Sequence, residues 1–487
     1  MKMKSKLLIF LIIVITLILS YSVISKSITK TDSLILSKIK SVIPISVKNL
    51  IKSTFFESEI LNKRIKELNE IILSQNIVLK NRYDTIKEIP SKFLNGYYPF
   101  ITFKKKNSDK IYNINNLKYK LSKFETGYLG SGKAGGAAAS GYFEEYTDKI
   151  FLATGDGQFF YFYKDKLSET TFDAITINSN FKDAVKFSKI YVRSDYGIKG
   201  FFLKNKKIYV SYSNEMNKDC FNTEILVAEL NFQFLKFEKF FSPKNCIKKK
   251  NQYGAFVAHI AGGKMFDYND NKILFSHGGY GYAEKAQSKD DVFGKILSIN
   301  ANDGTSKIIS MGHRNVQGIF FDKENNTILS TEHGPMGGDE LNINVNPEKN
   351  SIKNYGWPIS SYGSHGVGND WMYEKGPLNK SHKKYGFVEP IIYYVPSIGI
   401  SPIEKIPNNF NLEFNNDYFI GAMGADIDEG DKSIHHIKLD NDFKKILSNN
   451  IIPINERVRD IKYIKSINKV LLFLENSPAI GLLSLVD

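Results

Sequence analysis

The chain has 487 residues, of which 42% are hydrophobic and 13% aromatic, so it is long enough to bury a large core. Its formal net charge of +15 comes mostly from scattered lysines, and no arginine-rich tract or nucleic-acid-binding motif accompanies it. A basic chain can bind nucleic acid or anionic lipid, but without such a motif we expect no nucleic-acid partner.

The first 24 residues predict a membrane-spanning signal anchor. Three lysines in residues 1–6 precede an uncharged apolar run of eighteen residues, Leu7–Ile24, which is just long enough to cross a bilayer as a helix. A cleaved signal peptide is the alternative, although its apolar core is usually shorter and ends at a small-residue cleavage site. Because basic residues stay cytoplasmic, the pattern predicts a single-pass protein of the inner membrane with its catalytic domain on the periplasmic or extracellular side.

Residues 25–90 predict a helical stalk or spacer. Apolar residues at positions 60, 61, 65, 68, 71 and 72 fall on one face of a helix. The preceding segment, Ser33–Ser53, carries four lysines among isoleucines and suits an anionic membrane surface. Packing of a helix on the following domain, or on a second copy of itself, is an equal alternative.

Residues 91–487 predict an all-β domain of short strands separated by turns. Six β-rich apolar segments each follow a polar turn: Lys149–Thr154, Lys207–Tyr212, Lys272–Ser276, Thr327–Thr331, Asp417–Ala422 and Lys469–Leu474. The segments are mostly fifty to sixty-five residues apart, with one longer gap of ninety. A propeller blade is one four-stranded sheet, and repetition at a rough period is typical of radially arranged blades. Six repeats predict a six-bladed β-propeller.

A glycine-rich stretch at residues 127–134 is close to a phosphate-binding loop. Ala134 stands where that motif requires Ser or Thr after Lys133, and the glycines that follow interrupt the helix that the motif needs. We therefore expect a loop between early strands, not a nucleotide site.

The only two cysteines of the sequence are Cys220 and Cys246. In an exported chain they predict a disulfide between neighbouring strands. No Cys and His spacing indicates zinc.

A stretch of about fifty residues in the second half of the chain predicts a ligand site. Arg314 and Asn315 place a guanidinium beside a carboxamide, and the guanidinium fork suits a planar ligand with carboxylates or quinone oxygens. The turn at residues 332–335, with its Gly-Pro pair, can turn backbone carbonyls toward a cation. Asp339 and Glu340 then offer the oxygen ligands that calcium prefers. Each piece alone is more often a solvated loop, and it is their joint occurrence that favours a site.

Two further patterns lie outside this stretch. His259 precedes a glycine pair and a strand, where a histidine can act as a base, although lone histidines are more often structural. Near the C-terminus, Arg457 and Arg459 are two residues apart in a strand, so their guanidiniums point to the same side. A solvated or salt-bridged arginine pair is the alternative there.

Together these patterns resemble the signature of the glucose/sorbosone dehydrogenase family, quinoproteins that oxidise aldose sugars on a six-bladed β-propeller. Five segments carry the resemblance: GHRNVQG at 312–318, EHGPMGGDELN at 332–342, NYGWP at 354–358, PSIGIS at 396–401 and NERVRD at 455–460. The resemblance is good over Gly254–Leu485 and weak over Tyr97–Lys250. The first ninety residues lie outside it.

The resemblance implies an aldose sugar as substrate, an external electron acceptor as partner, and pyrroloquinoline quinone (PQQ) and calcium as cofactors. It implies that PQQ contacts Arg314, Asn315, Gln317, Ser397, Arg457 and Arg459. It implies calcium at the carbonyls of Gly334 and Pro335 and a second, structural calcium at Glu340 and Tyr355. The implied catalytic residues are His259, as general base, and Arg314.

Two departures from the family pattern keep a second function open. His259 lies one residue further upstream of Lys264 than the family pattern has it, and the run Gly421–Ala425 lacks the cofactor-binding lysine of some members, Lys432 being the next lysine. The alternative is therefore a propeller of this lineage that binds a carbohydrate or a protein without catalysis. The segment Tyr362–Tyr385 is the least family-like part, and we expect it to cover the site or to contact a partner.

Overall fold

The computed structural model describes residues 99–106, 108–127, 140–185, 197–250, 256–281, 283–335, 337–349, 351–363, 379–424 and 430–486. The chain divides into two compact units, Met1–Lys87 and Glu88–Asp487. All of the first unit lies outside the described residues, and so do the predicted membrane segment, the stalk and most of the glycine-rich stretch.

The prediction of a single-pass inner-membrane protein is corrected by the structure. In the part of the chain that the structure describes, no helix has the length and apolar character needed to cross a membrane. The predicted localisation therefore has no structural support.

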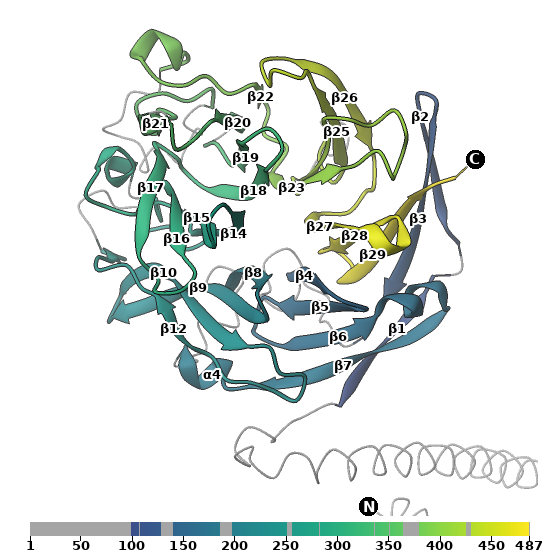
Figure 1. The fold of residues 1–487 in the computed structure, drawn as a ribbon. Helices are drawn as coiled ribbons and strands as arrows, with labels where there is room; N and C mark the ends of the chain where they lie inside the picture. Colours follow the sequence, from purple (N-terminus) through teal and green to yellow (C-terminus); the bar gives the residue numbers. More distant parts are fainter. Residues whose placement is uncertain are drawn as a thin grey trace, which may run out of the picture. The chain divides into compact units, whose positions relative to one another are not determined.

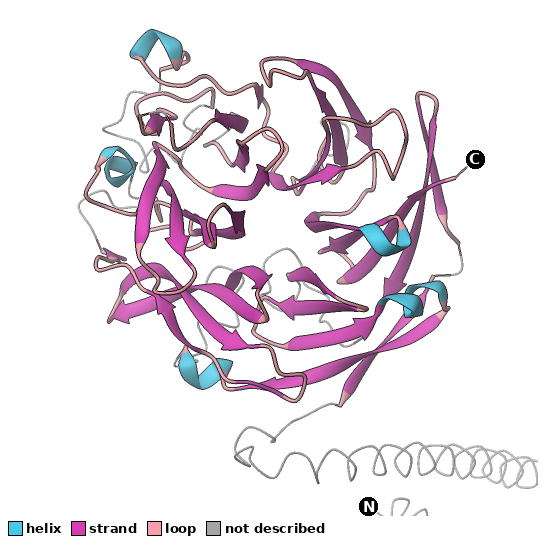
Figure 2. Ribbon diagram, in the orientation of Figure 1, coloured by secondary structure: helices cyan, strands magenta, loops and turns pink. Residues whose placement is uncertain are grey.

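Almost all regular structure in the described residues is β-strand, as the predicted all-β domain requires (Figure 2). Six runs of four antiparallel strands recur along the chain. The first three runs are β4 Gly141–Tyr146, β5 Lys149–Thr154, β6 Phe159–Tyr163 and β7 Thr171–Ser179; β8 Ile198–Lys204, β9 Lys207–Asn217, β10 Cys220–Glu229 and β12 Glu238–Phe241; and β14 Gly262–Tyr268, β15 Lys272–His277, β16 Lys295–Asn300 and β17 Ser306–Met311. The last three are β18 Val316–Asp322, β19 Thr327–Glu332, β20 Asp339–Val345 and β22 Ile392–Tyr394; β23 Ile400–Ile406, β24 Asp417–Ala422, β25 Ile434–Leu439 and β26 Ile446–Ile452; and β27 Val458–Ile464, β28 Lys469–Leu474, β29 Ala479–Leu485 and β3 Leu117–Glu125.

The remaining elements lie outside these six runs. They are the strands β1 Phe100–Lys105, β2 Lys110–Ile114, β11 Phe234–Leu235, β13 Ile247–Lys248 and β21 Lys353–Asn354, the helix α4 Phe181–Ala184, and the 3-10 helices η4 Lys164–Ser168, η6 Ala283–Gln287, η8 Lys383–Tyr385 and η9 Lys465–Ile467.

The first strands of the six runs form the inner ring of the domain. These strands, β4, β8, β14, β18, β23 and β27, contact one another in that order, and β27 contacts β4 to close the ring. Figure 1 shows the sheets arranged around a common centre. This arrangement is a β-propeller. Each of the six β-rich segments predicted from the sequence lies in the second strand of one run, β5, β9, β15, β19, β24 or β28, so these strand predictions are confirmed.

The ring is closed by pairing the two ends of the domain. β3, near its start, lies antiparallel to β29 at its end, with Leu121 opposite Leu483. β1 then pairs both with β3 and with β7, which joins the first and last runs into one eleven-stranded sheet. Ring closure therefore depends on strands more than 350 residues apart in the sequence.

Small residues let neighbouring inner strands approach closely. A Cβ added at Gly200 in β8 would lie 2.2 Å from the Gly263 carbonyl oxygen of β14. A Cβ at Gly318 in β18 would lie 2.8 Å from the Ser401 carbonyl oxygen of β23. Further out, buried Phe, Tyr, Ile and Leu side chains of adjacent sheets pack into continuous clusters, as expected for β-rich sequences with aromatic and branched residues.

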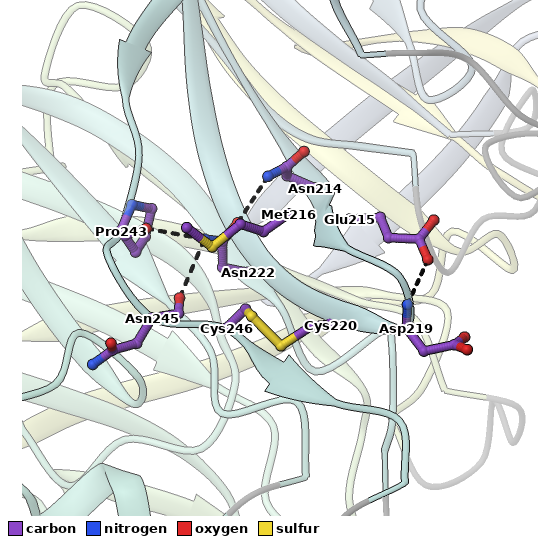
Figure 3. Close-up of a disulfide and its surroundings, with 9 residues drawn as sticks. All are labelled: Asn214, Glu215, Met216, Asp219, Cys220, Asn222, Pro243, Asn245 and Cys246. Atoms are coloured by element: carbon purple, nitrogen blue, oxygen red, sulfur yellow. Dashed lines mark hydrogen bonds between the residues drawn. A yellow bond between two sulfur atoms is a disulfide. The ribbon is translucent and has the colours of Figure 1, made fainter.

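The predicted disulfide is confirmed. Cys220, the first residue of β10, is bonded to Cys246, just before β13, with a Cα–Cα distance of 5.4 Å (Figure 3). The bond fixes β13 beside β10, with which it pairs. It lies in a polar setting in which the side chain of Asn222 donates to the carbonyls of Pro243 and Asn245.

Candidate functional site

The starts of the inner strands gather at one rim of the ring. The backbone N–H of Gly262, the first residue of β14, donates to Asn315 Oδ1 at 3.2 Å, just before β18. The N–H of Phe143 in β4 donates to Asp460 Oδ2 of β27 at 2.7 Å, and both are the third residues of their strands. Residues just before and at these strand starts therefore lie near one another, although they are far apart in the sequence.

Five of the six inner strands have a register irregularity near their start. It occurs in β8, β14, β18, β23 and β27. The residues at which the register shifts include Lys199, Lys264, Gln317, Ser401 and Arg459. A β-bulge releases a side chain from the alternation of the strand and re-aims it. Most of these residues are polar, so the bulges concentrate polar side chains at this rim.

Arg457 and Arg459 form the cationic centre of the site. Arg459 Nε donates to Glu475 Oε1 at 2.5 Å, and Arg457 Nε donates to Glu475 Oε2 at 3.0 Å. Burial alone would raise the pKa of Glu475, but Arg459 and Arg457 lower it to about 2. The carboxylate is therefore ionised at neutral pH. The two guanidiniums meet on it as a salt-bridged pair, the alternative that the sequence left open, and Arg457 lies just before β27 and not within that strand.

A polar chain connects this pair to the Arg-Asn motif. Arg459 Nη1 lies 3.4 Å from Gln317 Oε1, and Gln317 Nε2 donates to Asn315 Oδ1 at 3.0 Å. The backbone N–H of His333 donates to the Asn315 carbonyl at 3.0 Å, and Arg314 Nη1 donates to the His333 carbonyl at 3.1 Å. The structure thus brings together the predicted residues from β18 and β27, which belong to different sheets.

Glu332 holds the segment that carries Arg314. Its Oε1 accepts the backbone N–H of Arg314 at 3.0 Å, and its Oε2 lies 2.6 Å from His313 Nδ1. The His313 ring stacks on Tyr355, with ring centroids 4.8 Å apart. The Arg314 guanidinium lies 5.5 Å from the centre of the Trp357 ring, within the range of a cation–π contact.

His333 was not singled out from the sequence as a ligand-binding residue. Its Nε2 is buried, and none of the residues that the structure describes forms a hydrogen bond with it. Burial lowers the pKa of His333, Asp339 opposes that change, and Arg314 and Arg459 lower the pKa further. Buried polar atoms are nearly always hydrogen-bonded, so this nitrogen marks a place where a ligand atom would be accommodated. Its position before the Gly-Pro pair was the available sequence signal.

Asp339 holds the Gly-Pro turn at the same rim. Its Oδ1 accepts the backbone N–H of Gly334 at 3.1 Å and the hydroxyl of Ser397 at 2.9 Å, and its Oδ2 accepts the N–H of Ile400 at 2.8 Å. The turn folds so tightly that a Cβ at Gly334 would lie 2.2 Å from the Gly338 carbonyl oxygen. Ser397, predicted to contact the cofactor, thus donates its hydroxyl hydrogen to Asp339.

His259 lies on a turn next to the Arg314 segment. The turn is closed by the N–H of Ile260 bonding to the Val257 carbonyl at 3.1 Å, and the N–H of Tyr280 bonds to the Ile260 carbonyl at 2.8 Å. The adjacent Gly279 N–H bonds to the Arg314 carbonyl at 3.3 Å. The side chain of His259 is exposed.

Lys264 is a second residue whose part in the site the sequence did not reveal. Its Nζ lies 3.4 Å from Asp460 Oδ1 and 4.5 Å from the centre of the Tyr142 ring. β14 and β27 are not neighbours in the ring, so the Lys264 side chain reaches across its centre. Burial lowers the pKa of Lys264, Asp460 opposes that, and Arg459 lowers it further. The run from residue 421 lacks a lysine, and its Met423 carbonyl instead accepts Arg457 Nη1.

Glu340 and Tyr355 each already have a partner. His382 Nε2 lies 3.2 Å from Glu340 Oε1, an ion-pair distance without hydrogen-bond alignment, and Asn342 Nδ2 donates to Glu340 Oε2 at 3.2 Å. The Tyr355 hydroxyl donates to the Ile343 carbonyl at 2.8 Å. Among the residues that the structure describes, no three His, Cys, Asp or Glu side chains form a metal-binding group. A calcium ion at Glu340 would have to displace His382, so these two residues do not fit that ion as they stand.

Comparison with known sequences points to one family. The family model described as Glucose / Sorbosone dehydrogenase matches residues 194–479. The chain is 30% identical over 193 residues to an uncharacterized protein of Synechocystis, which covers 37% of this chain and 42% of that protein. It is 26% identical over 274 residues to the aldose sugar dehydrogenase YliI of Escherichia coli, which covers 54% of this chain and 68% of that protein. The chain thus matches less than half the length of the first of these relatives.

Solved structures share the fold. A glucose dehydrogenase superposes with a TM-score of 0.57 at 19% identity, over 72% of this chain and 98% of that one. The soluble aldose sugar dehydrogenase of Escherichia coli, in its apo-form, superposes with a TM-score of 0.55 at 18% identity, over 71% of this chain and 95% of that one. The PQQ-bound aldose sugar dehydrogenase of Streptomyces coelicolor superposes with a TM-score of 0.51 at 15% identity, over 78% of this chain and 100% of that one. At these identities the likeness establishes the fold alone.

Proposed function

Because this chain belongs to the glucose/sorbosone dehydrogenase family, we propose that it is a quinoprotein oxidoreductase that oxidises an aldose sugar at the anomeric carbon, with PQQ and calcium. Its substrate is a small-molecule sugar and its partner an external electron acceptor. The six four-stranded runs are then the six blades of the propeller, and the site lies at the rim where the inner strands start.

The observation that carries this proposal is the connected set of cations at that rim. Arg457 and Arg459 share Glu475, and Arg459 is linked through Gln317 and Asn315 to the segment of Arg314. PQQ is a planar quinone with three carboxylates, and guanidiniums bind carboxylates through parallel hydrogen bonds. The residues present therefore fit PQQ. The PQQ-bound form of the related fold from Streptomyces coelicolor supports the same choice of cofactor.

We assign the cofactor contacts residue by residue. Arg314, Arg457 and Arg459 would face the carboxylates, while Asn315 and Gln317 fix the orientation of the guanidiniums through the contacts described above. The Nε2 of His333, which has no hydrogen-bond partner among the described residues, adds a polar atom suited to the same ligand. Ser397 would act through Asp339, because its hydroxyl hydrogen is already given to that carboxylate.

Two residues would carry the proton chemistry. PQQ, when bound, supplies a two-electron acceptor, and the protein supplies position and charge. His259 is exposed on a turn beside Arg314, so it would take the proton of the anomeric hydroxyl as general base. Arg314 would hold the reacting oxygen in place with its fixed positive charge.

Calcium would bind at the carbonyls of Gly334 and Pro335, next to the cofactor. Oxygen donors are what this ion prefers, and the turn is held in a fixed shape by Asp339. A second calcium at Glu340 and Tyr355 is not part of the proposal, because His382 already lies against the Glu340 carboxylate.

Reconstitution of the purified full chain with PQQ and calcium tests this function. The readout is reduction of an artificial electron-accepting dye across a panel of aldoses. We expect saturable activity that needs both PQQ and calcium and that is lost on chelation. No PQQ binding at micromolar concentration would contradict the proposal, and saturable binding of sugars without PQQ would then favour the non-catalytic alternative.

A further inference from the structure

One buried carboxylate sets the positions of two guanidiniums. Glu475 directly follows β28 and is 8% exposed. Arg459 Nε and Arg457 Nε donate to its two oxygens at 2.5 and 3.0 Å. Ser140, which precedes β4 in the neighbouring run, donates its hydroxyl to Glu475 Oε1 at 2.6 Å. Each carboxylate oxygen is therefore fixed, and so is the carboxylate plane.

The same contacts determine which nitrogen of each guanidinium remains for a ligand. Arg457 Nη1 donates to the Met423 carbonyl, and Arg459 Nη1 lies 3.4 Å from Gln317 Oε1. Two held nitrogens fix the plane of a guanidinium, because the group is rigid. Within the part of the chain that the structure describes, neither arginine has a protein acceptor for Nη2. The Nη2 groups are thus the donors left for an anion.

The group formed by Arg457, Arg459 and Glu475 carries a net positive charge. Two guanidiniums share one carboxylate, which gives a net charge of +1, while Lys264 is paired separately with Asp460 at 3.4 Å. Glu475 stays ionised at neutral pH because Arg459 and Arg457 hold its pKa low in spite of burial. The carboxylate therefore orders both arginines without neutralising both.

We infer that Glu475 is a positioning residue that presents Arg457 and Arg459, through their Nη2 groups, to the carboxylates of the cofactor. This inference rests on the proposed function of the site. It assigns to Glu475 a favourable effect on the binding of an anion, although its own charge is negative. Pre-ordering of donors improves binding because less side-chain freedom is lost when the ligand arrives.

The sign of the effect separates positioning from simple electrostatics. If Glu475 acted only through its charge, removing that charge would strengthen the binding of an anionic ligand. If it acts by positioning, the neutral variant Glu475→Gln binds the anion more weakly, because its amide keeps one acceptor oxygen and turns an NH2 donor toward the other guanidinium, so one arginine loses its acceptor. The two views predict opposite changes in the same dissociation constant.

The test is a calorimetric titration of PQQ, with calcium present, into the full-length protein and its variants. We expect Glu475→Gln to raise the dissociation constant at least about tenfold, the effect of losing a charge-assisted hydrogen bond. Glu456→Gln is the matched control. Glu456 is also 8% exposed, and its replacement removes the same charge. Its carboxylate contacts Lys123 and Ser477 and not the guanidiniums. We expect it to leave the dissociation constant unchanged.

Calorimetry distinguishes positioning from loss of fold. A misfolded fraction lowers the number of binding sites, whereas positioning changes the affinity of every site. If Glu475→Gln does not fold, Ser140→Ala removes one of the contacts that hold the carboxylate, and a smaller weakening is expected. Binding by Glu475→Gln as tight as wild type, or tighter, would overturn the inference. If the wild-type protein does not bind PQQ, the proposed function fails and this inference fails with it.

Discussion

Replacing Asp339 by Asn tests whether one buried carboxylate holds the turn proposed to bind calcium. Asp339 is 1% exposed and accepts three hydrogen bonds, from Gly334, Ser397 and Ile400. An asparagine can keep its oxygen toward Gly334 and Ser397, but its amide nitrogen then faces the N–H of Ile400. Two donors meet there, and a buried donor is left without an acceptor.

The magnitude follows from these contacts. Losing a hydrogen bond to a charged group costs about 1.5–3 kcal/mol, and an unpaired buried donor costs about 1–3 kcal/mol. Because the two costs overlap, we expect Asp339→Asn to lower the free energy of unfolding by roughly 3 kcal/mol. Ser397→Ala removes a single bond to the same carboxylate and should cost about 1–2 kcal/mol.

The assay is urea unfolding of the full chain, combined with a calcium titration of PQQ binding. Asp339→Asn should also weaken the calcium dependence of PQQ binding more than Ser397→Ala does, because the bond from Ile400 is lost and the bond from Gly334 is then made to a neutral oxygen. A cost for Asp339→Asn equal to or below that of Ser397→Ala would refute the reasoning.

Three further predictions follow from the described contacts. The double variant Cys220→Ser and Cys246→Ser should lose about 3.5 kcal/mol of stability by the loop-entropy model, given the 26-residue separation; urea unfolding under identical conditions checks this, and an unchanged midpoint would contradict it. His259→Ala should abolish dye reduction while leaving PQQ affinity nearly unchanged, and unaltered turnover would remove His259 from the mechanism. The pKa of Glu475 is depressed to about 2, so its stabilising effect is complete above pH 5 and is lost as the pH falls toward 2. The acid limb of stability should therefore be flatter in Glu475→Gln, and identical slopes in the two proteins would sink that expectation.

Strand positions were readable from the sequence because each depends on local composition. The segments predicted at Lys149–Thr154, Asp417–Ala422 and Lys469–Leu474 have the same bounds as β5, β24 and β28. β-branched and aromatic residues between polar turns favour strands without any tertiary information. Ring closure by β3 was not readable, since it depends on pairing with the distant β29.

Sequence motifs pointed to the cationic residues of the candidate site but not to the residues that bind them. Arg314, Arg457 and Arg459 stand in recognisable motifs, whereas Glu475 follows a strand with no motif around it. Its importance arises only when the fold brings two arginines onto one carboxylate. His382 likewise meets Glu340 only through tertiary packing, so the sequence could not reveal this neighbour of the predicted second calcium site.

The register irregularities are a second reason why the site could not be predicted fully from the sequence. Pairing alternation would place successive residues of β18 and β27 on opposite faces. The register irregularities at Gln317 and Arg459 change that alternation where the strands begin. No sequence rule used for strands indicates such a shift, so the Gln317–Arg459 contact could only be found in the structure.

The most direct measurement is the reduction of bound PQQ in a single turnover, with an aldose and its C1-deuterated form compared. Wild-type protein loaded with PQQ and calcium is mixed with each sugar in the absence of an electron acceptor, and the absorbance of the quinone is followed. We expect loss of the oxidised quinone spectrum at a rate that saturates with sugar and is several-fold slower for the deuterated form. A spectrum that does not change with any aldose, although PQQ is bound, would contradict it.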